Sequence, residues 1–265
     1  MGFFIFGKFI SYYGFCIVMG MFFSYLTSYL LCKKLKLDTD DLLIICAYLI
    51  ALGFTGAKLL YIIVSIKSIN FKVVFSSLEY FNQFLSSGFV FYGGLLGGLG
   101  ALVIVKKAHH IDVKNYFKVL VPGLGIAHCF GRIGCSLAGC CYGKHTDGPL
   151  FFRYTKSIIA PLNENLFPVQ GLEAAGILLI TIICIILVLK QSKIKVLYLY
   201  LFSYSLLRFI LEFFRGDNER GHILFFSTSQ VISLGIILSL IGLLIYERRS
   251  HSALTENISE VSSQE

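Results

Sequence analysis

The sequence has few charged residues. Asp, Glu, Lys and Arg make up 14% of its 265 residues, whereas 56% are hydrophobic. An ordinary soluble domain carries roughly 25% charged residues, so a soluble fold of this composition would lack a polar surface. The shortage of charge therefore excludes a soluble protein. Because the apolar runs reach the length of a membrane span, we predict an all-α integral membrane protein.

Seven apolar runs approach or exceed the roughly 20 residues that cross a bilayer. We expect each to form a transmembrane helix, the fourth being too short to span comfortably: 10–31, 42–66, 88–105, 117–131, 169–189, 196–214 and 228–246. No small-residue cleavage site follows the first run, which excludes a cleavable signal peptide. Residues 1–249 are expected to form one polytopic membrane domain, and the polar residues 250–265 a disordered cytoplasmic tail.

The net charge of +8 is concentrated in short connections after every second run. Eleven basic residues form these clusters: Lys33, Lys34, Lys36, Lys106, Lys107, Lys114, Lys190, Lys193, Lys195, Arg248 and Arg249. Cytoplasmic loops are rich in lysine and arginine, so the pattern predicts an outer amino terminus and a cytoplasmic carboxyl terminus. The basic excess is thereby explained as a topology signal, and we expect no nucleic-acid partner.

The sixth run carries a stripe of polar residues. Tyr204, Arg208, Glu212 and Arg215 follow one another at spacings of four, four and three, which places them on one helix face. Ionisable residues inside a membrane usually face a cavity or pathway, although Arg208 and Glu212 could also form a purely internal ion pair. With Arg132 from another helix end, the stripe would carry net positive charge. We therefore expect an anionic partner, in this setting a lipid phosphate.

The glycine-rich stretch "FYGGLLGG" covers residues 91 to 98. Gly93 and Gly94 are each followed by a glycine four residues later, a spacing that lets helices approach closely. Packing is the simpler interpretation. The position beside Tyr92 at the outer end of a helix also leaves room for a lipid headgroup. A nucleotide phosphate loop is excluded, because no Lys-Ser/Thr pair follows.

The stretch "HCFGRIGCSLAGCCYGKH", residues 128 to 145, contains half of the eight cysteines. Their spacing matches no C-x-x-C zinc or redox pattern, and adjacent Cys140 and Cys141 are poorly placed to chelate one metal. We therefore expect no metal and favour small buried side chains in a tight turn. Two alternatives remain open: a zinc site completed by His128 and His145, and a disulfide on an oxidising outer face.

The segment "GRIGCSLAGCCYG" resembles the signature of the prolipoprotein diacylglyceryl transferase family, which has a Gly-Arg-x-Gly-Asn core. Six other segments resemble motifs of that family, in the same order: "YYGFCIVMG", "GFTGAKLLY", "FYGGLLGG", "FPVQGLEA", "LRFILEFFR" and "FSTSQVIS". The resemblance covers most of the chain. The sequence departs from the family pattern where Lys58 replaces an arginine, Tyr92 a histidine and Cys135 an asparagine, and again at Ala138 and Cys140.

The resemblance implies a multi-pass, thioether-forming transferase of the bacterial cytoplasmic membrane, with its active site in the outer half. It would move a diacylglyceryl group from phosphatidylglycerol to the lipobox cysteine of a prolipoprotein, without a cofactor. The implied catalytic residues are Arg208, Tyr92, Tyr204 and Glu212, and those that bind the phospholipid are Arg132, Tyr13, Gly93, Gly94, Gly143 and Arg215.

Two alternative functions use other features of the same sequence. One is a metal-binding or thiol-redox membrane protein built on Cys129, Cys135, Cys140 and Cys141. The other is a phospholipid-dependent transferase whose acceptor is not a lipobox.

Overall fold

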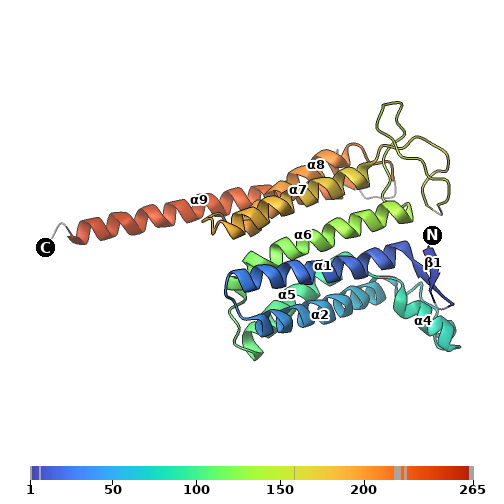
Figure 1. Ribbon diagram of the computed structural model, residues 1–265, viewed down its shortest axis with the longest axis horizontal. Helices are drawn as coiled ribbons and strands as arrows, with labels where there is room; N and C mark the ends of the chain where they lie inside the picture. Colours follow the sequence, from blue (N-terminus) through green and yellow to red (C-terminus); the bar gives the residue numbers. More distant parts are fainter. Residues whose placement is uncertain (1, 6, 158, 218–221, 224–225, 263–265) are drawn as a thin grey trace. The chain divides into compact units, whose positions relative to one another are not determined.

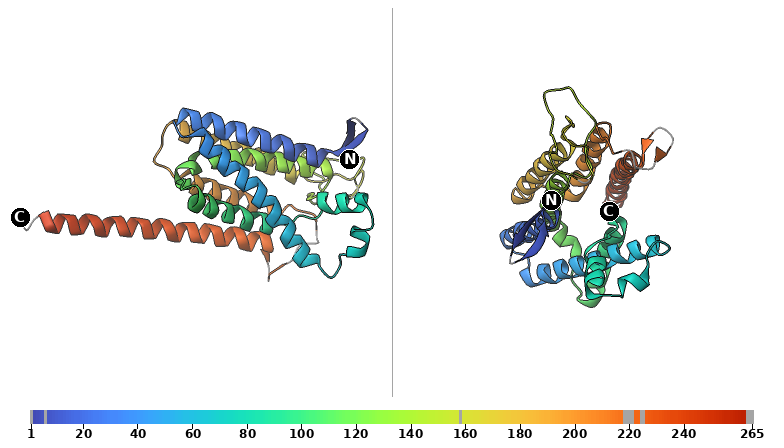
Figure 2. Two further views of the ribbon diagram at one scale, coloured as in Figure 1. Left: turned by 90° about the horizontal axis from the view of Figure 1, so that it is seen from below. Right: turned by 90° about the vertical axis from the view of Figure 1, so that its right-hand side faces the viewer.

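The computed structural model describes residues 2–5, 7–157, 159–217, 222–223 and 226–262. The described chain is mostly helical (Figures 1 and 2). Its seven longest helices are α1 (Tyr12–Lys34), α2 (Thr39–Ser65), α5 (Phe91–Ala108), α6 (Val113–Ala138), α7 (Val169–Leu189), α8 (Val196–Glu212) and α9 (Thr228–Ser262). Six of them are long and apolar enough to cross a membrane, α8 being shorter at 17 residues. The prediction of an all-α multi-pass membrane protein is confirmed.

The helix that contains the fourth predicted run, 117–131, is longer than expected. It lies within α6, a helix of 26 residues that includes the fully buried Pro122 and continues past Arg132. We ended the run before Arg132 because an unpaired charge is costly in an apolar helix. In the structure the charge of Arg132 is paired with Glu173, so the helix continues for about two further turns.

The last helix also extends beyond its prediction. The backbone of α9 remains helical to Ser262 and thus covers most of the segment that we expected to be disordered. A helix that has already nucleated gains one hydrogen bond for each residue added, which favours its continuation. Ser227 and Gln230 begin α9 with a reciprocal capping box: Ser227 N donates to Gln230 Oε1 over 3.0 Å, and Gln230 N donates to Ser227 Oγ over 3.2 Å.

Two pairs of strands and two short helices were not predicted, because they lie at the start of the sequence or in the connections between apolar runs. β1 (Gly2–Ile5) pairs with β2 (Lys8–Ser11), and β3 (His222–Ile223) pairs with β4 (Phe226–Ser227), both antiparallel. α3 (Phe71–Val74) and α4 (Leu78–Ser86) follow the side-chain caps Asn70 and Ser77.

The chain divides into two compact units, residues 1–28 with 118–265 and residues 29–117. In the first unit small residues let the helices pack closely. A Cβ on Gly125 would meet Thr181 Oγ1 of α7 at 2.1 Å, and one on Gly176 would meet Leu207 of α8 at 2.5 Å. α8 also packs against α9. These contacts bring polar residues of α6, α7, α8 and α9 together.

In the second unit α2 and α5 pack against each other through glycines. A Cβ on Gly93 would lie 2.3 Å from Gly56 O, and one on Gly97 would lie 2.1 Å from Leu52 O. Gly94 is less tightly enclosed, since its Cβ would meet Ala57 Cβ at 3.6 Å. This close backbone contact supports packing as the role of the glycine-rich stretch.

Gly93→Ala is expected to lower the stability of the protein, because the added methyl group cannot fit against the backbone of Gly56. Overpacking of this kind costs about 1–3 kcal/mol, which thermal unfolding in detergent would detect. Gly98→Ala is the matched control on the same helix, since the nearest atom to its Cβ would be Leu49 Cδ2 at an ordinary 3.8 Å. A Gly93→Ala variant of unchanged stability but defective lipid binding would instead assign this glycine to a headgroup pocket.

Candidate active site

The first unit contains a buried cluster of charged residues centred on Glu173, in α7. Glu173 is fully buried. Its Oε1 accepts a hydrogen bond from Tyr204 OH over 3.0 Å and lies 3.2 Å from Arg132 Nε, while Oε2 accepts from Arg208 Nη1 over 3.3 Å. A buried carboxylate is costly unless charged and hydrogen-bonding partners surround it. Here one carboxylate holds two guanidinium groups close together.

The polar stripe on α8 takes part in this cluster. Arg208 is buried and lies between two carboxylates, because Nη1 contacts Glu173 and Nη2 lies 2.8 Å from Glu212 Oε2. Nη2 also donates to Ser229 Oγ over 3.3 Å. The Arg208–Glu212 pair anticipated from the sequence therefore exists, as one part of a network to which α6, α7, α8 and α9 contribute.

Arg215 follows α8 and extends the network to the adjoining loop. Its Nε and Nη2 donate to the two oxygens of Asp217 over 2.9 and 2.7 Å, and its Nε lies 3.9 Å from Glu212. Nη1 is buried and has no hydrogen-bond partner among the described residues. A buried guanidinium with an unused donor can accept an anionic ligand at little further cost.

The charge balance of the cluster differs from our expectation. We expected a net positive charge, because the sequence drew attention to only one carboxylate. In the structure Glu173 and Asp217 join Glu212, so that three carboxylates accompany three arginines. The capacity for an anion therefore depends on unused donors. Nη1 of Arg215 is one, and the forked end of Arg132 provides others, because Arg132 contacts Glu173 through Nε and is 18% exposed.

Aromatic residues on α6 and α8 position the cluster. His128 Nδ1 lies 2.9 Å from Tyr200 OH, and the His128 ring stacks edge-on against Tyr204, with 4.6 Å between the ring centres. These contacts fix the hydroxyl of Tyr204 toward Glu173. His128 thus has a packing and hydrogen-bonding role in the described structure.

Two predicted lipid-binding residues lie close to helix ends: Gly143 in the loop after α6, and Tyr13 at the start of α1. Gly143 forms an antiparallel bridge with Arg215, and a Cβ at this position would lie 2.1 Å from Phe167 O. Only glycine allows so close an approach, which positions the backbone of Arg215. Tyr13, near the start of α1, is 44% exposed and packs against Gly134 of α6.

The other predicted site residues belong to α5 in the second unit. Tyr92 is half exposed, and its ring lies edge-on to that of Phe91 at 5.8 Å. Gly93 and Gly94 face α2, as described above.

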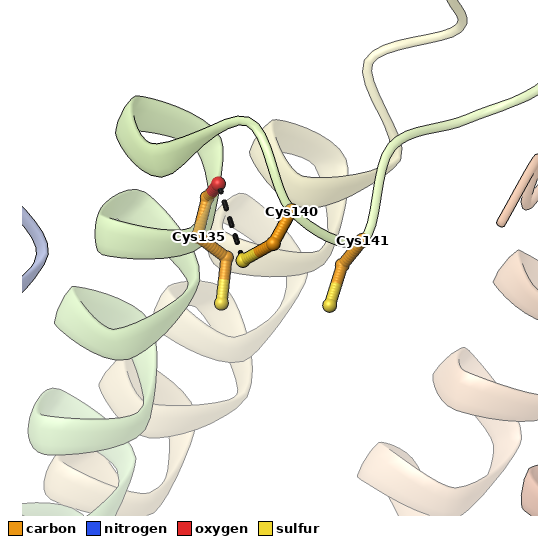
Figure 3. Close-up of side chains that lie close together, drawn as sticks. All are labelled: Cys135, Cys140 and Cys141. Carbon is orange, nitrogen blue, oxygen red and sulfur yellow. Dashed lines mark hydrogen bonds between the residues drawn. The ribbon is translucent and has the colours of Figure 1, made fainter. Parts of the chain in front are cut away.

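Three of the four cysteines near the end of α6 form a cluster of their own (Figure 3). The sulfur atoms of Cys135, Cys140 and Cys141 all lie within 4.8 Å of one another. The Cys140 thiol donates to Cys135 O over 3.7 Å. The pKa of Cys141 is lowered by its interactions with the side chains of Cys135 and Cys140 and by the charge of Arg215. Cys129 lies apart and donates to Ala174 O over 3.4 Å.

Glu173 and Gln170, in the segment "FPVQGLEA", were not among the predicted site residues. A carboxylate at the start of an otherwise apolar helix is a signal that could have identified Glu173. Gln170 is buried and donates to Cys140 O over 2.9 Å and to Tyr154 OH over 3.1 Å, thereby tying the cysteine loop to α7.

Comparisons with known proteins agree with the features described above. Residues 2–246 match the family model described as prolipoprotein diacylglyceryl transferase. The chain is similar to the phosphatidylglycerol–prolipoprotein diacylglyceryl transferase of Clostridium tetani, with 36% identity over 243 residues, 91% of this chain and 94% of the relative. It is also similar to transferase 2 of that name from Clostridium perfringens, with 32% identity over 247 residues, 91% of this chain and 92% of the relative.

Proposed function

Because the chain belongs to the prolipoprotein diacylglyceryl transferase family, we propose that it transfers a diacylglyceryl group from phosphatidylglycerol to a lipobox cysteine. The acceptor is the signal peptide of a prolipoprotein, and the second product is glycerol phosphate. The observation that carries this proposal is the convergence of Arg132 and Arg208 on Glu173 inside a membrane protein. Two guanidinium groups held together in this way suit a phosphate.

The reaction exchanges one bond for another at a glyceryl carbon. The acceptor thiol loses its proton, its sulfur forms a bond to the terminal glyceryl carbon, and the bond from that carbon to the phosphate oxygen breaks. The bonding electrons stay with the phosphate. A diester with one negative charge becomes a monoester with nearly two, so negative charge grows on the leaving group as the reaction proceeds.

The arginines are suited to stabilise this growing charge. We assign Arg132, whose forked end remains available, to the phosphate of the bound lipid. We assign Arg208 to the charge that develops on the leaving oxygen, because interactions that strengthen in the transition state accelerate the reaction. Two carboxylates hold these guanidinium groups in place: Glu173 contacts both, and Glu212 contacts Arg208. The hydroxyl of Tyr204 donates to Glu173 and so helps to hold that carboxylate. Arg215, with its unused Nη1, would complete the phosphate contacts.

The proposal is tested by incubating the purified protein with phosphatidylglycerol labelled in its headgroup and a lipobox peptide. We expect release of labelled glycerol phosphate that depends on the peptide. A peptide with serine in place of the lipobox cysteine is the matched control and should give none. Release with a non-lipobox thiol but not with the lipobox peptide would support a transferase with another acceptor. No release with any thiol would contradict the proposal.

The proposed orientation has its own test. Lys193 lies in a lysine-dense connection that we place in the cytoplasm, so a cysteine introduced there should react with a membrane-impermeant thiol reagent only after the cells are opened. A cysteine introduced at the exposed Glu164, in a connection that we place outside, should react in intact cells. Labelling of residue 193 in intact cells would reverse the orientation and the outer location of the site.

Tyr92→Phe is expected to retain most of the transfer activity. The ring of Tyr92 is half exposed, and phenylalanine preserves its shape. If the hydroxyl of Tyr92 were instead the general base, its loss should cost about 10²- to 10⁴-fold. Initial rates of transfer for Tyr92→Phe and Tyr12→Phe, a tyrosine outside the proposed site, distinguish these outcomes.

A further inference from the structure

The cysteine cluster has no role in the mechanism proposed above, yet its geometry is that of a ligand site. The sulfur atoms of Cys135, Cys140 and Cys141 lie within 4.8 Å of one another, and all three side chains are partly buried (Figure 3). Within the part of the chain that the structure describes, this is the group that brings three metal-ligating side chains together. His128 and His145 do not belong to it.

The backbone between these cysteines explains why adjacent residues can act together. Gly139, with a φ of +76°, ends α6 in a Schellman motif: its N–H donates to Ser136 O and that of Cys140 to Cys135 O. Cys141 then has a φ of +61°, an uncommon conformation for a residue other than glycine. We expected neighbouring cysteines to diverge, as they do in an extended chain. The left-handed turn instead brings both sulfurs close to Cys135.

The surrounding structure holds this turn in place. Gln170 donates to Cys140 O over 2.9 Å from a buried position on α7. On the other side, Gly216 N donates to Tyr142 O over 3.0 Å. Strained conformations persist where the surroundings determine them, frequently at ligand sites. The backbone that carries Cys140 and Cys141 is therefore held by hydrogen bonds from two neighbouring segments, as the supporting structure of a metal site should be.

The chemistry of three thiols selects a soft cation. Thiolates favour Zn²⁺ and Cu⁺ over harder metals. Sulfurs bound at about 2.3 Å to a tetrahedral Zn²⁺ would lie roughly 3.8 Å apart, which small side-chain rotations can reach from the present separations. Three thiolates and one Zn²⁺ carry a charge of −1. The guanidinium groups of Arg132 and Arg215 both act electrostatically on Cys141 and would offset that charge.

We propose that Cys135, Cys140 and Cys141 form a three-thiolate zinc site whose open fourth position binds the thiol of the acceptor cysteine. Catalytic zinc sites typically have three protein ligands and one exchangeable position, and a thiol that coordinates a metal loses its proton. The incoming thiol would displace a bound water, release its proton to solvent and remain as the nucleophile. This role rests on the proposed function. It would supply the deprotonation of the acceptor thiol in a chain that has Tyr92 in place of the family's histidine.

Zinc analysis of the purified full-length protein tests the site without any measurement of activity. After reconstitution with Zn²⁺ under reducing conditions and removal of the excess, we expect about one Zn²⁺ for each wild-type chain. Cys135→Ser, Cys140→Ser and Cys141→Ser should each retain less than about a tenth of that amount. Cys46→Ser, which changes a partly buried free cysteine outside the cluster, is the matched control and should bind like wild type. Equal helical content by circular dichroism verifies folding.

Two results would overturn the site. One is zinc in the wild type at no more than the level of the triple serine variant. The other is a disulfide among the three cysteines that persists in the reduced, zinc-treated protein, as detected by mass spectrometry of its peptides.

The open position is tested with Co²⁺ in place of Zn²⁺. Adding a lipobox peptide should increase the sulfur-to-cobalt charge-transfer absorption, and the serine peptide should not. An unchanged spectrum with saturating cysteine peptide would exclude coordination of the acceptor. Full-rate transfer by metal-free protein would refute the activating role while leaving the proposed function intact. A thiol-binding zinc site without any transfer from phosphatidylglycerol would refute the function while leaving the site intact.

Discussion

Arg208→Ala is expected to lower the rate of diacylglyceryl transfer by about 10²- to 10³-fold, the cost of removing one preorganised donor from a developing negative charge. Arg208 is buried between Glu173 and Glu212, so its loss removes the cation proposed to face the leaving phosphate. Arg208→Lys should recover little activity, because an ammonium group cannot reproduce the fork that contacts two carboxylates and is proposed to face the phosphate. Initial rates with phosphatidylglycerol and a lipobox peptide measure the effect.

Arg249→Ala is the matched control, since Arg249 is an exposed arginine in the second half of α9, outside the buried cluster. It should transfer at the wild-type rate. Because Arg208→Ala leaves Glu173 and Glu212 with one guanidinium partner fewer, its stability has to be measured in parallel. A folded Arg208→Ala variant with near-wild-type transfer would contradict the proposed role of this arginine.

Glu173→Ala is expected to destabilise the protein by about 3–5 kcal/mol, the usual cost of removing one partner from a buried ion pair. The loss of Glu173 would leave Arg132 without its carboxylate and Arg208 with Glu212 alone. Glu173→Gln should be milder, since the amide keeps the shape and one acceptor oxygen. Denaturant or thermal unfolding in detergent would measure the difference.

Glu164→Ala provides the comparison for this stability effect, because Glu164 is an exposed carboxylate in the connection before α7. It should change stability by no more than about 0.5 kcal/mol. Equal stability of Glu173→Ala and Glu164→Ala would mean that the buried cluster is not held together by Glu173. The proposal that this carboxylate positions two arginines would then be wrong.

Much of the fold could be predicted from the sequence, because a membrane imposes a simple rule on helix length. The apolar runs located the long helices. The predicted ends of two helices were wrong, and each error has a physical cause. Arg132 was placed outside its helix because a charge in an apolar run is costly unless paired, and its partner on α7 lies far away in the sequence. The helical backbone beyond residue 249 was missed because polar composition reports on solvation rather than on helix continuation.

The candidate site could be predicted only in part. The stripe on α8 follows from helical spacing, and Arg208 and Glu212 do contact each other. Glu173 was overlooked because nothing in its own segment indicates that two arginines converge on it. That convergence depends on the packing of α6, α7 and α8.

The cysteine cluster shows a different limit of sequence reasoning. Because Cys140 and Cys141 are adjacent, the sequence indicates that they are poorly placed to bind one metal together. The structure places Cys141 in a left-handed conformation, which residue types alone do not indicate. Gly139 was the visible clue, since glycine commonly ends a helix in such a turn.

The most direct test of the central claim is the mass of a lipobox peptide after incubation with the purified protein and phosphatidylglycerol of defined acyl chains. We predict that the peptide gains the mass of one diacylglyceryl group, and that the adduct resists hydroxylamine at neutral pH, which cleaves thioesters, because its link to sulfur is a thioether. An unmodified peptide, or a hydroxylamine-sensitive adduct with the mass of a single acyl chain, would contradict the account.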